Sequence, residues 1–210
     1  MVWSTIPAVH LLQAITPTPP QPVLEAASTL RHRAMVFVYL VCDQSRYTPF
    51  DAHYFPGLDT PIARLSEPKN YRDGPDPQGQ TVLCAELACW EGDDIWSASD
   101  DDLGELVVEA LERQGLGRPR LVATETRRLP KVYPVYPVGY RAEVAPAFDW
   151  LESQRRLANF GRQGLFVPDN LHHALAMGSA AAMSLQLDGS FDRDRWLASV
   201  RGFESHVVED

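Results

Sequence analysis

The segment that most constrains the fold runs from residue 157 to residue 185, where an apolar strand, a glycine-bearing turn and a long helix are predicted. The turn contains Gly161 and Gly164. Glycine adopts positive φ and lets a second backbone approach closely, so both residues are expected to serve one of these needs. The apolar residues on the two sides of the glycines are Leu157, Phe160, Leu165, Phe166 and Val167. This unit predicts that a sheet and a helix are joined by a tight turn.

The helix of this unit is predicted from Leu171 to about Leu185, with Asp169 or Asn170 as its N-cap. Small residues recur every fourth position along it, so one face carries no bulk: Ala174, Gly178 and Ala182. Its first turn has unpaired N–H groups and a partial positive charge, which suit an anionic ligand atom. Two interpretations stay open on spacing alone. One is a helix packed tightly on a sheet, which spacing favours, and the other is a helix whose N-terminus meets a ligand.

Two linked motifs in this segment resemble the carboxy-terminal flavin motif of the FAD-dependent amine oxidoreductase superfamily. They read Gly161-Arg162-x-Gly164-x-Phe166 and Asn170-x-x-His173-Ala174-Leu175-x-Met177-Gly178-x-x-Ala181. The similarity is greatest to the branch of protoporphyrinogen-oxidase-like and UDP-galactopyranose-mutase-like proteins. It implies FAD as the cofactor, and it implies FAD-binding roles for Gly161, Arg162, Asn170, His173, Ala174 and Leu175. Many relatives carry an Asp where this chain has His172, which leaves no implied side-chain contact there.

The amino terminus contains a second, shorter match. Val2 to Pro7 is predicted to end a buried strand, His10 is expected to start a short turn, and four prolines up to Pro22 forbid regular structure. In the superfamily a Ser-Thr-Ile-Pro segment closes the dinucleotide-binding domain, so the resemblance implies that Thr5 and Pro7 lie near the FAD. No Gly-x-Gly-x-x-Gly turn occurs in the chain. We therefore expect the carboxy-terminal portion of a longer flavoprotein.

The central residues predict an α+β fold with an antiparallel sheet. Four strands are expected at residues 34–41, 52–55, 62–65 and 81–89. A helix follows with Ser99 as its N-cap, and a fifth strand covers 121–128. Further helices are predicted at residues 145–157 and 192–200, and residues 207–210 form a tail. Taken with the resemblance, the expected domains are the end of an FAD-binding domain (1–22), a substrate domain (23–144) and a returning FAD-binding segment (145–210) of an incomplete Rossmann-type domain.

Three residues are candidates for contact with a small-molecule substrate. Tyr133 and Tyr136 belong to a repeated Tyr-Pro segment, whose prolines exclude a central strand and whose rings suit either a pocket or an edge packed on a core. In relatives a similar segment lies at the junction of the two domains. Arg64 resembles a substrate-domain arginine and suits an anionic substrate, although a surface ion pair is the simpler explanation.

Composition narrows the location and the partners. The net charge of −9 argues against a nucleic-acid partner, and no apolar run is long enough to span a membrane. Three cysteines, Cys42, Cys84 and Cys89, fit a reducing cytoplasm. An odd separation puts Cys84 and Cys89 on opposite faces of a strand. A zinc site that combines them with His172 and His173 is an incomplete pattern, so no metal is expected.

The sequence therefore predicts an FAD-dependent oxidoreductase that is active only when its amino-terminal half completes it. The flavin carries the redox chemistry in such proteins, which agrees with the lack of a nucleophile motif. One alternative is a UDP-galactopyranose-mutase-like isomerase, for which Arg64, Arg141 and Arg162 are candidate pyrophosphate ligands. Another is a non-catalytic fragment or interaction domain, whose uncovered apolar face would dimerise or bind the absent half.

Overall fold

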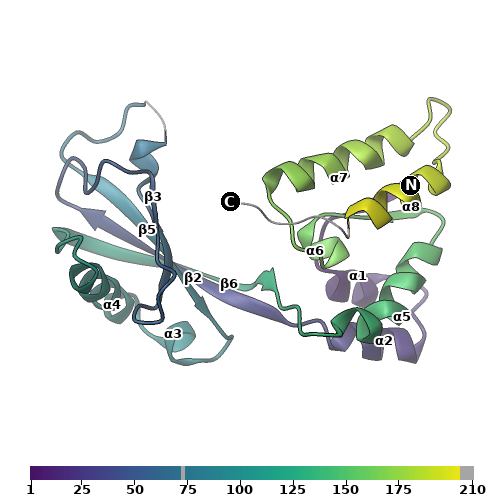
Figure 1. The fold of residues 1–210 in the computed structure, drawn as a ribbon, viewed down its shortest axis with the longest axis horizontal. Coiled ribbons are helices and arrows are strands. Elements are labelled where there is room, and N and C mark those ends of the chain that lie inside the picture. Colours follow the sequence, from purple (N-terminus) through teal and green to yellow (C-terminus); the bar gives the residue numbers. More distant parts are fainter. Residues whose placement is uncertain (72–73, 204–210) are drawn as a thin grey trace. The chain divides into compact units, whose positions relative to one another are not determined.

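The computed structural model describes residues 1–71 and 74–203, and the chain divides into two compact units. Unit 1 combines residues 1–32 with residues 133–210, and unit 2 comprises residues 33–132 (Figure 1). The boundaries predicted between the FAD-binding segments and the substrate domain lie after residues 22 and 144. They differ from the boundaries of the compact units, and the assignment of domains to FAD and substrate remains a prediction. Among the described residues, no helix has the length and apolar character needed to cross a membrane.

Unit 2 is built on an antiparallel sheet, as the sequence predicted. In the described residues the strand order is β3-β4-β5-β2-β6. The strands are β2 (His32–Cys42), β3 (Ala52–Tyr54), β4 (Ile62–Ser66), β5 (Thr81–Cys89) and β6 (Leu121–Pro134). The fifth strand continues six residues past its predicted end at Arg128. Its edge position explains this, because an edge strand tolerates the missing amides of Pro130 and Pro134.

The register fixes which side chains enter the core of unit 2. Val38 pairs with Ala85 and both are fully buried, whereas Tyr39 pairs with Cys84 on the opposite face. Cys89 belongs to the core and Cys84 does not, so the prediction that they face opposite ways is confirmed.

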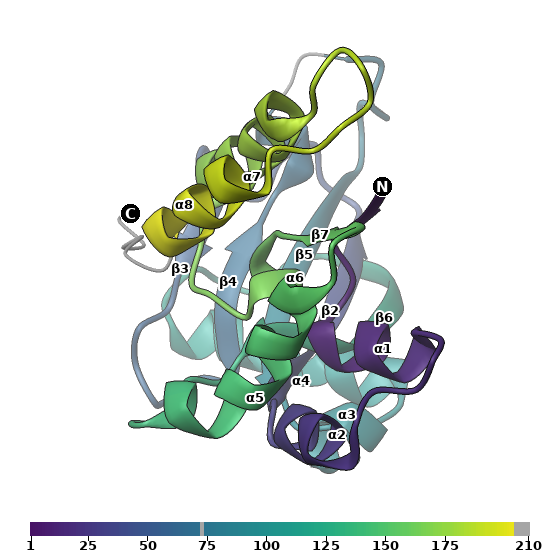
Figure 2. The same cartoon turned by 90° about the vertical axis from the view of Figure 1, so that its right-hand side faces the viewer.

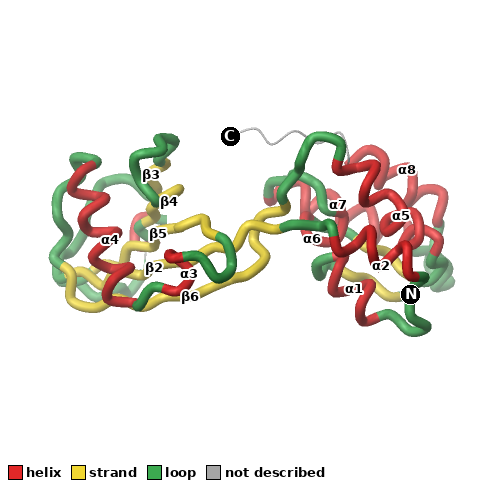
Figure 3. The backbone as a smooth tube through the Cα atoms, turned by 90° about the horizontal axis from the view of Figure 1, so that it is seen from below, coloured by secondary structure: helices red, strands yellow, loops and turns green. Residues whose placement is uncertain are grey.

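Helices α3 (Asp94–Ser97) and α4 (Asp100–Arg113) lie beside this sheet (Figure 3). The short 3₁₀ helix Pro68–Asn70 (η1) precedes β5. The Oγ of Ser99 accepts a hydrogen bond from the Asp102 amide, which confirms the predicted N-cap. The apolar stripe of α4 completes the core, with Leu103, Val107 and Leu111 all fully buried. A Cβ on Gly104 would come within 2.2 Å of Thr124 Oγ1, so α4 packs very closely on β6.

Unit 1 has a small parallel sheet made of β1 (Val2–Ser4) and β7 (Leu157–Asn159). Helices α1 (Ala8–Ala14), α2 (Gln21–Ser28) and α5 (Tyr140–Ser153) pack together around one apolar cluster (Figure 2). Two expectations need correction. The predicted short turn at His10 is helix α1, and the helix predicted at 145–157 runs from Tyr140 to Ser153, because the left-handed Gly139 ends the preceding extended segment at φ 85°.

The remaining helices of unit 1 are α6 (Arg162–Leu165), α7 (Leu171–Ser184) and α8 (Arg193–Phe203). Helices α7 and α8 lie side by side (Figure 2) and share an apolar cluster centred on Met177 and Trp196. The helices predicted at 171–185 and 192–200 are thus confirmed within a few residues. The predicted tail at residues 207–210 lies outside the described residues.

Candidate functional site

The carboxyl ends of β1 and β7 meet in unit 1, as parallel pairing requires. The Phe160 amide donates to the Ser4 carbonyl over 2.9 Å. An added Cβ on Gly161 would lie 3.9 Å from the Thr5 Cβ, so two of the predicted site residues are neighbours. Gly161 has φ 81°, a backbone conformation that favours glycine. The Gly161 amide is also directed at Met177 Sδ of α7, 3.3 Å away.

Gly164 serves close approach, because its φ is not positive. A Cβ at this position would come within 2.8 Å of Asn159 Oδ1, and Asn159 Nδ2 donates to the Gly164 carbonyl over 2.5 Å. The second left-handed residue of the turn is Phe166, with φ 54°, at the C-cap of α6. The sequence did not indicate this conformation, because a bulky residue rarely adopts it.

Arg162 links the turn to the start of α7. Its Nε donates to Asp169 Oδ1 over 2.6 Å, and its Nη2 donates to the Asp169 carbonyl. The guanidinium also lies 5.1 Å from the centre of the Tyr133 ring, within cation–π range. Asp169 is 3% exposed, so this carboxylate is buried against its partner. Sequence reasoning treated Asp169 only as an N-cap candidate and missed this role.

The N-cap of α7 is Asn170. Its side chain accepts from the His173 amide, while His173 Nδ1 accepts from the Asn170 amide over 3.0 Å, which completes a capping box. The outer side of the first turn is open, because Leu171 is 78% and Leu175 67% exposed. Farther along, an added Cβ on Gly178 would meet nothing within 4 Å. The small-residue face is therefore not filled by another backbone of the described chain.

Two other predicted residues lie near this turn with different exposure. Tyr133 is 43% exposed beside Arg162. The Tyr136 ring packs on Phe166 and Tyr140, with ring centres 5.4 Å and 5.3 Å away. Burial raises the pKa of the Tyr136 hydroxyl well above its usual range, and the nearby Tyr140 adds to this. Pro7 stands at the amino-terminal end of α1, where its carbonyl accepts from the amides of His10 and Leu11.

Several polar atoms around the turn are buried without a hydrogen-bond partner. They are Ser4 Oγ, Asn159 Oδ1, Tyr136 Oη and Asp169 Oδ2. An unpaired buried polar atom costs free energy, and such atoms are normally satisfied by water or a ligand. The turn is thus suited to a ligand that offers hydroxyl or amide groups. With the open N-terminus of α7, it has the polar character that a flavin's ribityl chain and pyrimidine edge require.

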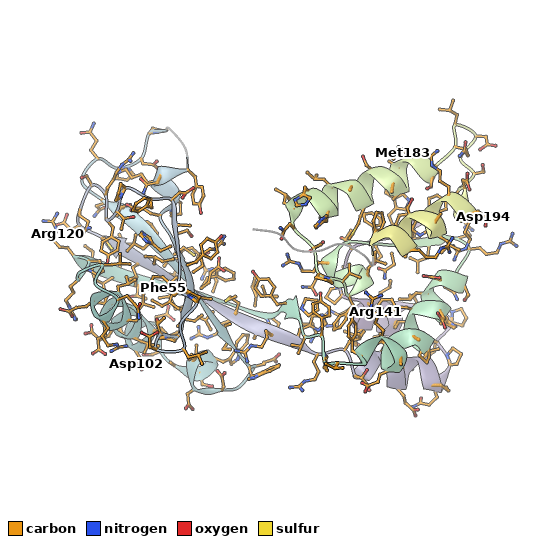
Figure 4. The ribbon with its side chains drawn as sticks, in the orientation of Figure 1. Phe55, Asp102, Arg120, Arg141, Met183 and Asp194 are labelled. Carbon is orange, nitrogen blue, oxygen red and sulfur yellow. The ribbon has the colours of Figure 1, made fainter. Side chains whose placement is uncertain are left out.

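A cavity of about 200 Å³ opens on unit 1 between α5, α8 and residues 165–167, which follow the glycine turn. Its floor is apolar and includes Phe148, Phe166 and Val200. Arg141, Asp149 and Glu152 of α5 form a charged rim, and Figure 4 labels Arg141 on this helix. Neither Tyr133 nor Tyr136 lines it, so their predicted contact with a substrate remains a prediction.

Arg64 lies in unit 2 and forms the ion pair that the sequence suggested as the simpler explanation. Its Nε donates to Glu86 Oε1 over 2.9 Å across neighbouring strands. Burial acts to lower the pKa of Arg64, but its interactions with Glu86 and Tyr54 together raise the pKa above its usual value. The pair lies in one row across the sheet with Tyr54 and Phe37. Glu86 already balances the positive charge of the Arg64 guanidinium. An anionic substrate would therefore have to displace Glu86 to bind Arg64.

All three cysteines are unpaired and buried. Among the described residues, no group of three or more histidine, cysteine or acidic side chains is arranged to hold a metal ion.

Comparisons with known proteins agree on the fold. No protein-family model matches the sequence, and no curated protein matches it. Among solved structures, the chain is similar to reduced UDP-galactopyranose mutase over 99% of its own length, with a TM-score of 0.72 and 20% identity. It is also similar to a putative protoporphyrinogen oxidase from Exiguobacterium sp. 255-15 over 97% of its length, with a TM-score of 0.56 and 18% identity.

The chain spans less than half of either solved protein, 45% of the mutase and 40% of the oxidase. Identities this low show the fold alone. The predicted α+β fold is therefore confirmed, and the predicted likeness to UDP-galactopyranose-mutase-like and protoporphyrinogen-oxidase-like proteins is confirmed as a likeness of fold.

Proposed function

We propose that this chain forms the substrate domain and the returning flavin-contacting segment of an FAD-dependent oxidoreductase. The observation that carries the proposal is the close approach of Thr5 and Gly161, which follow the two strand ends, together with the hydrogen bonds by which Arg162 joins this turn to Asp169 ahead of α7. In open α/β folds, ligands bind beyond the carboxyl ends of parallel strands. The proposal extends to a cytoplasmic location, which the three unpaired cysteines support.

The residues that would hold FAD are those of the turn and of the helix start. They are Thr5, Pro7, Gly161, Arg162, Asn170, His173, Ala174 and Leu175. Gly161 keeps the backbone free of a side chain, and Asp169 fixes the guanidinium of Arg162. The first amides of α7 present partial positive charge to an electron-rich ring edge. FAD supplies hydride and electron transfer when bound.

Substrate contact is proposed for Arg64, Tyr133 and Tyr136. Arg64 would bind an anionic group of a small molecule, while the tyrosines offer ring faces. The buried hydroxyl of Tyr136 stays protonated because burial raises its pKa, so it would act as a hydrogen-bond donor rather than as a base.

The chain alone is expected to bind FAD weakly, because no described segment supplies a Gly-rich pyrophosphate turn. The test is to purify the chain, add FAD and record flavin absorbance and fluorescence after gel filtration. The same measurement is then made with the amino-terminal portion of the mutase added. Retention of colour only in the mixture supports the proposal. A matched pair of variants, Gly161→Ala at φ 81° and Gly189→Ala at φ 83° in a distant turn, separates loss of the site from backbone strain.

Failure of the mixture to hold FAD, with both parts folded, would favour a non-catalytic interaction domain. The alternative enzyme is a UDP-galactopyranose-mutase-like isomerase, which the TM-score of 0.72 to the mutase favours. Addition of UDP-galactopyranose to the reduced FAD complex tests it. Conversion of the sugar without net oxidation would establish the isomerase. Oxidation of a different substrate that reduces oxidised FAD, followed by reoxidation of the flavin by an acceptor, would establish the oxidoreductase.

A further inference from the structure

The cavity on unit 1 shares none of the residues assigned to FAD. It is lined by α5, α8 and residues 165–167, and its volume is about 200 Å³. The residues assigned to FAD lie in the amino-terminal segment, at the start of the glycine turn and in the first turn of α7, and none of them lines the cavity. A molecule bound here would be a second ligand of unit 1, so the inference below goes beyond the proposed function.

The cavity exists because the two helices beside it each pack mainly on another helix. Helix α5 packs on α2, and α8 packs on α7. Arg193 at the start of α8 bridges one end of the space between them, since its Nη1 donates to the Gln154 carbonyl over 3.1 Å. Two walls of the cavity are therefore regular helices, which the two apolar clusters of unit 1 hold in place.

The floor of the cavity is apolar and aromatic. Val144 and Phe148 of α5 contribute to it, and Val200 of α8 and Phe166 complete it. The Phe166 ring is 2% exposed and packs edge-on against Tyr136, with ring centres 5.4 Å apart, so this part of the floor is rigid. An apolar cavity of about 150 Å³ is large enough to bind benzene. The space here therefore suits one aromatic ring with a short side chain.

The rim of the cavity carries charge of both signs, at different ends. Arg141, Asp149 and Glu152 are exposed side chains of α5. Asp149 and Glu152 are three positions apart, so they are neighbours on one face of the helix. Arg141 precedes Asp149 by about 12 Å along the helix axis. Asp149 takes part in no ion pair among the described residues, so its charge is available to a ligand.

We propose that this cavity binds a small arylalkylamine, with the aromatic ring on the apolar floor and the ammonium group beside Asp149 and Glu152. An anion of the same size is disfavoured, because its charge would lie against two carboxylates. An aromatic α-amino acid is disfavoured as well. Its two charges sit on adjacent carbon atoms, whereas Arg141 and Asp149 lie about 12 Å apart along α5.

The first experiment titrates the full chain, without FAD, with three probes of matched shape: 2-phenylethylamine, 2-phenylethanol and 3-phenylpropionate. Binding is followed by the NMR shifts of the backbone amides and of the Trp196 indole, which lines a small chamber that shares Phe148 and Val200 with the cavity. The amine should bind saturably with a Kd on the order of 1 mM. The alcohol should bind about fivefold more weakly and the carboxylate more weakly still. The shifts should be confined to α5, α8 and residues 165–167.

The charge assignment is tested by a matched pair of variants on α5. Asp149→Asn should weaken binding of the amine by about threefold and leave binding of the alcohol unchanged. Glu143→Gln removes the same charge from an exposed position of α5 that does not line the cavity, so it should leave both affinities unchanged. This comparison separates a local contact from the general attraction of a chain of net charge −9 for cations.

The location is tested by filling the cavity. Ala145 lines it, whereas Ala142 on the same helix is exposed and does not. Ala145→Met should therefore weaken binding of the amine and of the alcohol by about tenfold, and Ala142→Met should leave both unchanged. Circular dichroism of each variant checks that the fold is retained. If Ala145→Met does not fold, the shifts of the parent and the Asp149→Asn comparison decide the location.

Three results would overturn the inference. The first is the absence of saturable binding of the amine up to about 10 mM, which is about ten times the expected Kd. The second is a set of shifts that lies outside the cavity lining or survives in a folded Ala145→Met variant. The third is equal binding of the amine and the carboxylate, or equal effects of Asp149→Asn and Glu143→Gln. Because FAD is absent throughout, none of these results bears on the proposed function.

Discussion

Unit 2 concentrates buried ionisable groups at one end of its sheet. The Glu67 carboxylate, 2% exposed, accepts from the amides of Tyr47 and Thr48 at 2.9 Å and 3.0 Å and from the Thr81 hydroxyl at 2.6 Å. Burial, with the charge of Glu67 nearby, raises the pKa of the Cys42 thiol to about 11 and that of Tyr47 to about 12. These two groups are therefore neutral in the folded protein over the pH range in which they would ionise in an unfolded chain.

This arrangement predicts a loss of stability in alkali. An unfolded thiol loses its proton near pH 9, whereas the folded Cys42 keeps it up to about pH 11. The contribution of Cys42 to the free energy of unfolding is therefore complete below pH 9 and is lost as the pH rises through 11. Over that range the unfolded state binds fewer protons than the folded state. The full shift corresponds to a loss on the order of 3 kcal/mol. Urea unfolding of the parent and of Cys42→Ala between these limits should show a shallower pH dependence for the variant, and parallel curves would refute the assignment.

At the scale of elements, the start of α7 is held by an unusual capping box. Histidine occupies the position where glutamate or glutamine normally stands, and His173 Nδ1 accepts the Asn170 amide. The sequence indicated the helix and offered Asn170 as a cap, but a histidine acceptor is not a recognised signal. The same limit applies to α5, whose start at Tyr140 was hidden by a Tyr-Pro repeat and whose Pro146 lies inside the helix.

Two substitutions separate the hydrogen bond from the ring. His173→Gln retains a side-chain acceptor at this position and should change the free energy of unfolding by less than about 0.5 kcal/mol. His173→Ala removes it and should cost about 1 kcal/mol. Thermal unfolding followed by circular dichroism measures both, with His172→Ala as the control on the neighbouring exposed position. Equal effects of the glutamine and alanine variants would show that the ring, not the acceptor, stabilises the helix.

At the scale of the whole molecule, two cores form without sharing residues. Every member of the unit 2 core lies between Ala34 and Leu111, and every member of the main unit 1 cluster lies outside residues 33–132. The continuous run of β-branched and aromatic residues in β2 allowed that strand to be predicted, and the strand-like runs that follow it in the chain allowed the antiparallel sheet to be predicted. The sequence predicted a central domain at residues 23–144, but it did not predict the boundaries of unit 2 at residues 33 and 132, because these depend on α2 meeting α5 more than a hundred residues later.

The candidate site shows the same division. Gly161 and the start of α7 were predictable, because a left-handed turn and an N-cap have local signals. Phe166, Asp169 and the unpaired atoms of Ser4 and Asn159 were not, because a left-handed bulky residue, a buried ion pair with Arg162 and an unpaired buried oxygen have no recognised sequence signal. These features were therefore visible only in the structure.

The separation of cores predicts that residues 33–132 fold alone. The fragment retains the whole buried cluster of unit 2 and the close contact of Gly104 with Thr124. Circular dichroism should show one cooperative thermal transition. Leu103→Ala, at a fully buried position, should cost about 2–5 kcal/mol, whereas Glu109→Ala on the exposed face should be close to neutral. A fragment that unfolds gradually would contradict the prediction.

The insertion of unit 2 into the chain of unit 1 also orders events on the ribosome. Unit 2 is complete once residue 132 has emerged, but α1 and α2 must wait for α5, and β1 must wait for β7. During that interval the apolar residues of α1 and α2 that pack on α5 have not yet met their partner helix. The time taken to translate unit 2 and then α5 therefore sets how long α1 and α2 depend on chaperones before they are enclosed.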